Sequence, residues 1–436
     1  MPPQTMRLAL RIVLRAFLLH AFQVVCAQAG ETAPVINEIH YDEADKTEAS
    51  EFIEIYNPTD AAISLAGWEI SGGVDFRFPA ASLIESGAYL VIAQDPATIT
   101  RKFRRNGSLG PWSGRLRNSG ETVSLRDPDG AVVSQADYRL GFPWPTVGEP
   151  VDGVSPSIQL IHPGLETDLG GSWRSARPTP GLQNEVYSTE APPQTRQVSH
   201  YPLQPRSNEP VVITALVTDP DGVSSVLLSY QIVRPGAYFG RYLKYNQNGT
   251  ANIDTAYDRG WGELPMRDDG QGDDEVAGDG VYTATVPFNL NRNRYLTRYR
   301  ITVEDADGNS VRVPYEDDPQ FNFAYFVYNG TPDWRGAIRE GDSPVTYSGE
   351  LMSSIPTYFL LSRSTWVDDS QFGGYRGAEY LWPGTLVYEG KVYDHIRYRP
   401  RGGVHRFQYG KNFWKFDFNR GHRFQARDEY GNEYET

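Results

Sequence analysis

The chain has 436 residues, 39% of them hydrophobic and 13% aromatic, and carries a formal net charge of −14 at pH 7. This length accommodates two to four domains, and the aromatic content is too high for a disordered protein. The acidic balance argues against general nucleic-acid binding, and no segment beyond the N-terminus is apolar enough to span a membrane.

The first 29 residues have the features of a secretory signal peptide. Three arginines precede a short apolar run at residues 16–25, and small residues follow up to Ala29. We therefore expect a secreted, periplasmic or cell-surface protein that begins at Gly30. Cleavage there removes Cys26, the single cysteine, so the mature protein would have no disulfide and no cysteine-based metal site. The alternative of a lipidated Cys26 lacks the small residue expected just before it.

Short β-rich runs recur between turn signals along most of the remaining chain. Several of these runs end in Asp-Pro-Asp-Gly or Asp-Ala-Asp-Gly sequences, which begin at Asp127, Asp219 and Asp305. In such turns the aspartate caps the backbone through its side chain, and the glycine adopts a positive φ. Helical periodicity is almost absent before about residue 350. The pattern predicts a mainly β protein with more than one antiparallel sandwich.

Composition divides the mature chain into three units. Residues 185–205 are rich in Pro, Gln and Ser and lack periodicity, which predicts a linker stiffened by proline. A second break falls near residues 329–336. The expected organisation is a signal peptide at 1–29, units at 30–184 and 206–328, and a last unit at 335–436.

The first unit contains VINEIHYD, EFIEIYNPTDAAISLAGWEISGG, LRNSGETVSLRDPDGAVVSQADY and WRSARPTPGLQN in that order. These sequences resemble the lamin-tail domain, an immunoglobulin-like β-sandwich, over nearly all of residues 30–184. The resemblance implies an accessory module that binds or positions and does not catalyse. Independently of it, residues 52–56 predict a buried strand, and Leu65, Trp68 and Ile70 predict further core.

Four acids of the first unit leave two interpretations open. Carboxylate oxygens suit hard cations, so these side chains could form a metal site. In the simpler interpretation, Glu51 and Glu54 flank a buried strand and face water. The four acids are Glu38, Asp42, Glu51 and Glu54.

The second unit contains VVITALVTDPDGVSSVLLSYQI and YRITVEDADGNSV. It resembles the immunoglobulin-like domains that precede catalytic modules in bacterial surface proteins. A glycine-rich acidic loop lies between these sequences and could offer the six to eight oxygens that Ca²⁺ takes. The spacing is not that of an EF-hand, and a solvated turn is the alternative. The candidate calcium ligands are Asp268, Asp269, Asp273, Asp274 and Asp279.

The third unit contains IPTYFLLSRSTWV, GKVYDHIRYRPRGG and GKNFWKFDFN. These sequences resemble the start of the CotH kinase-like domain of large exported bacterial proteins. The resemblance implies a strand and helix followed by paired strands near a pocket for ATP and Mg²⁺. It places the metal-holding carboxylates further along than Thr436, so we expect a partial kinase-like domain at residues 335–436.

The charge of the third unit is compatible with a phosphate site. Residues 391–427 contain ten Lys or Arg and two acids, and phosphate binding needs such cations. Lys415 lies between Trp414 and Phe416, so strand alternation places it opposite the aromatic face. Arg401 and Lys415 are the candidate nucleotide-binding residues, and a solvated basic face is the alternative. We assign three histidines to the same basic surface: His395, His405 and His422.

Together these patterns predict two immunoglobulin-like β-sandwiches plus an incomplete α+β kinase-like segment. The function expected is that of an exported or cell-surface protein whose sandwiches bind or position an extracellular or envelope protein or a polysaccharide. We expect no catalysis by this chain, no nucleic-acid partner, and calcium as a candidate cofactor. The alternative is the N-terminal part of a CotH-like atypical protein kinase that uses ATP and a divalent metal such as magnesium.

Overall fold

The computed structural model describes residues 32–150, 152–245, 251–337, 341–372, 381–401, 413–428 and 430–434. Over these residues the chain is mainly β, as the sequence predicts, and the strands of every sheet pair in antiparallel fashion. The expected signal peptide lies outside the described residues. Over the described ranges, no helix has both the length and the apolar character needed to cross a membrane.

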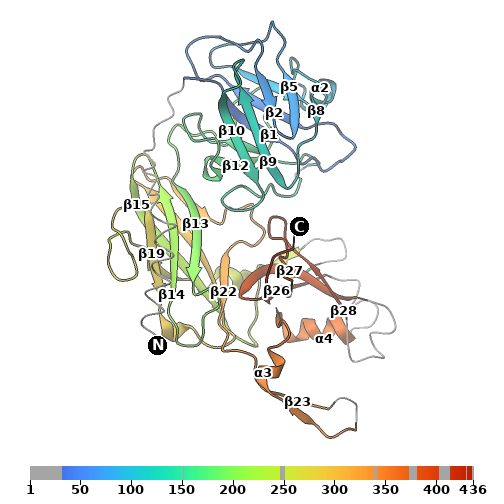
Figure 1. The fold of residues 1–436 in the computed structure, drawn as a ribbon, viewed down its shortest axis with the longest axis vertical. Helices are drawn as coiled ribbons and strands as arrows, with labels where there is room; N and C mark the ends of the chain where they lie inside the picture. Colours follow the sequence, from blue (N-terminus) through green and yellow to red (C-terminus); the bar gives the residue numbers. More distant parts are fainter. Residues whose placement is uncertain are drawn as a thin grey trace.

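The first unit is a sandwich of two five-stranded sheets, drawn in blue to teal in Figure 1. Its strands are β1 (Val35–His40), β2 (Phe52–Tyr56), β3 (Ile63–Ser64), β4 (Glu69–Ser71), β5 (Val74–Arg77), β6 (Leu83–Ile84), β7 (Tyr89–Ala93), β8 (Ser113–Gly114), β9 (Gly120–Arg126), β10 (Val132–Arg139), β11 (Ser157–Leu160) and β12 (Trp173–Ala176). One sheet has the order β12-β11-β1-β2-β7 and the other the order β10-β9-β4-β5-β8, while β3 and β6 pair separately.

Apolar side chains of both sheets form one core in the first unit. The strand predicted at residues 52–56 is present, and its first four residues are buried. Trp68, a predicted core residue, is only partly buried. The fully buried tryptophan is Trp173, whose indole Nε1 donates a hydrogen bond to the carbonyl of Thr167 at 2.9 Å. Trp173 is therefore the larger contributor to this core.

A short helix, α2 (Pro96–Phe103), follows β7 although apolar periodicity does not predict it. The side chain of Asp95 caps its N-terminus by accepting a hydrogen bond from the amide of Ala97 at 3.1 Å, and proline occupies its first turn. Arg104, with φ 57°, ends it in the left-handed conformation. Capping residues at its two ends, and not an amphipathic pattern, therefore identify this helix.

The second unit is also a two-sheet sandwich, consistent with the immunoglobulin-like class. Its strands are β13 (Gln194–Tyr201), β14 (Val211–Thr218), β15 (Val223–Val233), β16 (Tyr242–Tyr245), β17 (Ala251–Ile253), β18 (Gly262–Pro265), β19 (Val281–Val286), β20 (Leu296–Asp305), β21 (Ser310–Val313) and β22 (Phe323–Phe326). One sheet has the order β13-β14-β19. The other has the order β18-β15-β20-β21, and β22 also pairs with β20.

The linker is shorter than the sequence predicts. Of the expected residues 185–205, residues 194–201 form β13 and pair with β14, so the second sandwich begins near residue 194. The sequence of this strand, QTRQVSHY, has few apolar residues because it lies at a sheet edge, where three of its eight positions are exposed. The polar composition of this segment therefore led to the prediction of a linker where a strand is present.

The third unit is built on one four-stranded sheet, drawn in orange to red in Figure 1. Its elements are β23 (Trp334–Gly336), β24 (Val345–Tyr347), α3 (Gly349–Met352), β25 (Tyr358–Leu361), α4 (Ser364–Phe372), β26 (Trp382–Tyr388), β27 (Lys391–Arg401) and β28 (Phe413–Asp417). The sheet order is β25-β26-β27-β28, and β23 pairs with β24. The strand and helix expected within residues 355–367 correspond to β25 and the start of α4.

Hydrophobic packing is continuous across the unit boundaries. One buried cluster combines Val233 and Phe326 of the second unit with Trp382 and Tyr398 of the third. From the first unit, Phe142 packs against the core of the second. The compositional break near residues 329–336 therefore marks a change of sheet but not a gap in the packing.

Candidate functional site

A fully buried ion pair joins the second unit to the third. Arg298 on β20 and Asp394 on β27 have no exposed side-chain surface. The guanidinium Nε and Nη2 donate to the two carboxylate oxygens at 2.6 and 3.1 Å. Asn322 donates a further hydrogen bond to the same carboxylate at 3.0 Å, and the hydroxyl of Thr385 donates another. Buried charges are tolerated only when they are paired and hydrogen-bonded, and this pair meets both conditions.

The surroundings of this pair are aromatic. Burial alone would raise the pKa of Asp394, but the guanidinium of Arg298 holds that pKa below its usual range. Arg298 also donates to the carbonyl of Phe239 at 2.8 Å and lies 5.8 and 5.4 Å from the ring centroids of Tyr238 and Tyr257. Loss of either partner would leave the other charge uncompensated in a site without water-exposed surface.

His395, next to Asp394, is buried and neutral, so its assignment to a basic surface is wrong. Its side chain is 2% exposed, and the rings of Tyr257 and Phe321 stand perpendicular to it at 5.0 and 5.6 Å. Burial lowers the pKa of His395 to about 3. Its φ is positive, at 54°, and it lies within a run of β27 where residues 393–396 are all buried, so the alternation of the strand is broken. His405 lies outside the described residues.

Residues 419–422, which we call the junction segment, contact both sandwiches. Arg420 donates from Nε to the carbonyl of Thr146 at 2.9 Å and forms an ion pair with Asp42, both in the first unit. His422 Nε2 lies 2.8 Å from the carboxylate of Asp318 in the second unit. Figure 1 shows the C-terminal end of the chain at the point where the first unit meets the other two.

Two glycines allow the junction segment to approach the first unit closely. Gly421 and Gly141 both have positive φ, at 76° and 82°. A Cβ on Gly421 would lie 3.2 Å from the backbone of Gly141, closer than side chains normally pack. Glycine therefore serves two needs at Gly421, the left-handed conformation and the close contact between backbones.

The first and second units also contact each other directly. The carboxylate of Asp317 accepts hydrogen bonds from the amides of Thr146 and Val147 at 2.8 and 3.1 Å. The guanidinium of Arg174 lies 4.2 Å from the ring centroid of Tyr315. Polar and aromatic contacts thus connect all three units, and the third unit contacts both of the others.

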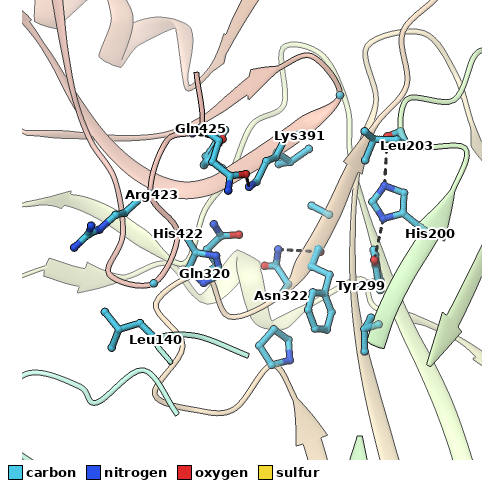
Figure 2. Close-up of a pocket in the computed structure, with 18 of the residues that line it drawn as sticks. Leu140, His200, Leu203, Tyr299, Gln320, Asn322, Lys391, His422, Arg423 and Gln425 are labelled. Atoms are coloured by element: carbon cyan, nitrogen blue, oxygen red, sulfur yellow. Dashed lines mark hydrogen bonds between the residues drawn. The ribbon is translucent and has the colours of Figure 1, made fainter. Parts of the chain in front are cut away.

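All three units line one cleft at their junction, with a volume of about 500 Å³. Figure 2 shows Lys391 beside Gln425 on one wall, and His200 between Tyr299 and Leu203 on another. Leu140 is the first unit's labelled contribution. A cleft of this size falls in the range occupied by small-molecule ligands.

The charged side chains that line the cleft are all basic. They include Arg139, Lys391 and Arg423, and no Asp or Glu is among the described residues of its walls. Of the two histidines, His200 lies 3.0 Å from the hydroxyl of Tyr299, and burial lowers its pKa. The charged groups on the cleft walls are therefore basic although the whole chain is acidic, with Arg139 ion-paired to Asp137 and His422 beside Asp318.

Lys391 has a neutral partner in this cleft. Its ammonium group donates to the side-chain carbonyl of Gln425 and lies 5.4 Å from the ring centroid of Tyr393. Partial burial on the cleft wall lowers the pKa of Lys391, although the residue as a whole is exposed; the charge of Glu433 acts in the opposite direction, and that of Arg427 adds a smaller lowering. Among the described residues, no carboxylate lies within ion-pair distance of this ammonium group. The charge of Glu433 influences the pKa of Lys391 without forming an ion pair with it.

The predicted nucleotide-binding residues lie on one face of the β27–β28 pair. The register places Arg399 opposite Lys415 and Arg401 opposite Phe413, so Arg401 and Lys415 are diagonal neighbours. The aromatic residues on either side of Lys415 pack on the opposite face, as the alternation predicts. Ten strand residues, or about 30 Å, separate Arg401 from Lys391, so this face is distinct from the cleft. Residues 402–412 are not described, and nucleotide binding stays a prediction.

The predicted calcium ligands lie in the loop between β18 and β19. Asp268 accepts hydrogen bonds from the amides of Gly278, Asp279 and Gly280 at 2.6, 3.2 and 2.9 Å. The loop thus uses this carboxylate to hold its own backbone.

Three further acids of this loop also accept hydrogen bonds from within the second unit. Asp274 accepts one from the amide of Gly270, Asp269 one from the amide of Gln271, and Asp273 one from the hydroxyl of Thr285. Within the described ranges, no group of three or more His, Cys, Asp or Glu side chains is arranged to hold a metal ion. Calcium binding stays a prediction.

The prediction that Glu51 and Glu54 face water is wrong. Glu51 is 6% exposed and Glu54 is 0% exposed, and Glu38, the cross-strand neighbour of Glu54, is also fully buried. The alternation of buried and exposed residues along a strand does not predict this burial, because a later segment covers the outer face of the sheet. From that segment, Thr179 donates its amide to Glu38 at 3.0 Å, and Gly181 donates its amide to Glu54 at 2.6 Å.

These two carboxyl groups take up protons more readily than ordinary glutamates. Burial raises the pKa of Glu38 to about 7, although hydrogen bonds from Ser157, Gln159 and Thr179 act in the opposite direction. Burial and the neighbouring Glu38 carboxyl raise the pKa of Glu54 well above its ordinary value. Adjacent buried carboxyl groups resist simultaneous ionisation, so this pair is a proton-binding element of the first unit.

Sequence reasoning missed the cleft because its walls come from segments far apart in the chain. Lys391 and Gln425 are 34 positions apart, and Tyr299 belongs to another unit. The excess of cations over residues 391–427 is the one local signal, and it pointed to the face of β27 and β28 instead. The structure places Lys391 and Arg423 on the walls of one cleft and leaves Arg401 and Lys415 elsewhere on the same sheet.

Comparison with known proteins identifies relatives for the first unit. The Lamin Tail Domain family model matches residues 27–139. The first sandwich is similar to lamin tail domains. This confirms the predicted resemblance of the first unit, and the structure extends the lamin-tail-like sheet beyond the match through β11 and β12.

The other comparisons were made over the whole chain. No curated protein matches the sequence. Among solved structures, a tetra-tandem repeat from the extending region of a large adhesion protein is 9% identical, covers 88% of each chain and has a TM-score of 0.15. A likeness at that level carries no argument about fold or function. The immunoglobulin-like and CotH resemblances of the second and third units stay predictions.

Proposed function

We propose that this chain is an exported or cell-surface module that binds and positions, and that its three units act as one body. The Arg298–Asp394 pair carries the proposal. The two charges come from different units and are shielded from water only while the second and third units stay packed. The contacts of Arg420 and His422 with both sandwiches support the same arrangement.

The lamin-tail-like sandwich supports a binding role over a catalytic one, because such sandwiches serve as accessory modules. The proposed partners are an extracellular or envelope protein or a polysaccharide, reached after export through the signal peptide. A body without free hinges holds its binding surfaces at fixed distances, which suits a positioning function. Export is tested by sequencing the N-terminus of the secreted protein, which should be Gly30; an N-terminus at Met1 or Met6 contradicts it.

Calorimetry of the full chain tests the single-body proposal. Units that share buried contacts unfold cooperatively, so the second and third units should unfold in one transition. Asp394→Ala should lower and split that transition because it uncouples the units. Separate unfolding transitions for the second and third units in the unaltered protein would contradict the proposal.

A second candidate function is that of a CotH-like atypical protein kinase, of which this chain supplies the N-terminal part. The observation that favours it is the placement of Arg401 and Lys415 on one sheet face beside Arg399. Under this alternative, ATP and magnesium would bind there. Incubation with labelled ATP and Mg²⁺ distinguishes the two functions. Phosphate incorporation that Lys415→Ala abolishes supports the kinase, and absence of incorporation with feeble, salt-sensitive ATP binding supports the binding module.

A further inference from the structure

We propose that the cleft at the junction of the three units binds a hydroxyl-rich anion of one or two sugar rings, held through a carboxylate or phosphate group. This site deepens the proposed binding function by naming a ligand class, and it rests on that function in requiring all three units to be packed. The ligand class follows from the charge, the size and the polar groups of the walls.

The charge of the walls selects an anion. Lys391 and Arg423 come from β27 and from the segment after the junction segment, and no acid among the described residues lines the same cleft. An oxyanion there would form charge-assisted hydrogen bonds, which are roughly twice as strong as neutral ones. The only acid that acts on Lys391 from the described surroundings is Glu433, which is ion-paired with Arg427 at 3.2 Å and lines no wall.

Lys391 is placed to hold that oxyanion. Its ammonium group has three donors, and the partner found for it in the structure is the neutral amide of Gln425. Lys391 is exposed, and a neutral acceptor leaves its charge uncompensated, so an anion that enters the cleft can pair with it. The amide of Gln425 also fixes the Lys391 side chain on the wall, as Figure 2 shows.

The remaining groups suit a sugar rather than a bare ion. A volume of about 500 Å³ exceeds what phosphate alone fills and falls in the range of small organic ligands. Gln320 lines the cleft with an amide that can both donate and accept hydrogen bonds. The ring of Phe323, which is only partly buried, provides apolar surface against which the C–H face of a sugar packs.

Titration calorimetry of the full chain at low salt tests the site with three probes: glucuronate, glucose 6-phosphate and glucose. We expect one or both anions to bind and glucose to bind at least about tenfold more weakly, since one charged hydrogen-bond set is worth about 1.4 kcal/mol or more. Binding of glucuronate alone assigns a carboxylate ligand, and binding of glucose 6-phosphate alone assigns a phosphate ligand. Equal binding of glucose, or no binding of either anion at about 10 mM, overturns the proposal.

Two variants and a matched control locate the binding. Lys391→Gln and Arg423→Gln should each weaken the bound anion about tenfold or more. Arg234→Gln makes the same charge change at an exposed arginine outside the cleft and should leave the affinity unchanged. Unchanged affinity in both cleft variants, or equal weakening by the control, overturns the site. The distance distribution between spin labels on the first and second units would stay narrow in that case. Failure of the site is therefore distinguishable from failure of the single-body proposal.

Discussion

Asp394 accepts two hydrogen bonds from the guanidinium of Arg298, although the residues are 96 positions apart and belong to different units. Neither side chain has any exposed surface. The pair is surrounded by hydrophobic residues contributed by both units, so it fixes how the second sandwich packs on the sheet of the third. It is the interaction whose disruption should affect the whole molecule most.

Replacing one partner of this pair should therefore destabilise strongly. Asp394→Ala should lower the free energy of unfolding by about 3–5 kcal/mol because it leaves the Arg298 charge buried and unpaired. The double variant Arg298→Met with Asp394→Leu removes both charges and should lose less stability than the single variant. Urea unfolding of the three proteins measures both effects. A double variant that loses as much stability as Asp394→Ala, or more, would show that the two side chains do not act as a pair.

The carboxyl pair of the first unit should make stability depend on pH. The pKa of Glu38 rises from 4.5 to about 7 on folding, so the folded state keeps a proton that the unfolded state loses. The stabilising contribution is full below pH 4.5 and is lost as the pH rises through 7. Unfolding of the first unit should therefore require a higher temperature at pH 5 than at pH 8.

Glu38→Gln provides the control for this pH effect. Glutamine has nearly the same shape and cannot ionise, so the decline between pH 5 and pH 8 should shrink relative to the unaltered protein. The comparison between the two proteins removes contributions from other groups, including His395. An identical decline in both would assign the effect to another residue.

The two tryptophans of the first unit should differ in their contribution to stability. Trp173→Ala should cost about 3–5 kcal/mol, because it empties a fully buried site and leaves the Thr167 carbonyl without its indole donor. Trp68→Ala should cost less, since Trp68 is only partly buried. Thermal unfolding of both variants measures the difference. A larger loss for Trp68 would contradict the placement of the core.

The acidic loop of the second unit should lose stability with Asp268→Asn. The substitution weakens three hydrogen bonds from backbone amides to a carboxylate, and it should lower the unfolding temperature in the absence of calcium. If the loop also binds calcium, millimolar Ca²⁺ should raise the unfolding temperature of the unaltered protein, because the ion binds the native state. Asp273→Asn should abolish that rise. No rise would leave Asp268 with its structural role alone.

Local patterns in the sequence predict much of the fold and little of the cleft. The strand at residues 52–56 and the Asp-Gly turns follow from side-chain chemistry that acts over a few residues. Strand β13 was missed because an exposed edge tolerates the polar sequence QTRQVSHY. The burial of Glu54 was missed because the segment that covers it comes more than 120 positions later.

Local sequence patterns do not predict the cleft. Lys391, Gln425 and Tyr299 have ordinary neighbours in the sequence, and they line one cleft only after the units pack together. Their positions depend on the contacts of Arg420 with the first unit and of Asp394 with the second. Such long-range contacts leave no periodicity that a sequence can display.

The distance distribution between spin labels on the first and second units tests the single-body account most directly. Val132 on β10 is 46% exposed, and Phe288, just after β19, is 58% exposed, so each accepts a label at an introduced cysteine once Cys26 is replaced by serine. The account predicts one narrow distribution, which the double variant Arg420→Ala with Asp317→Ala should broaden by removing contacts between the units. A broad distribution in the protein without that double change, as a flexible linker would give, would contradict it.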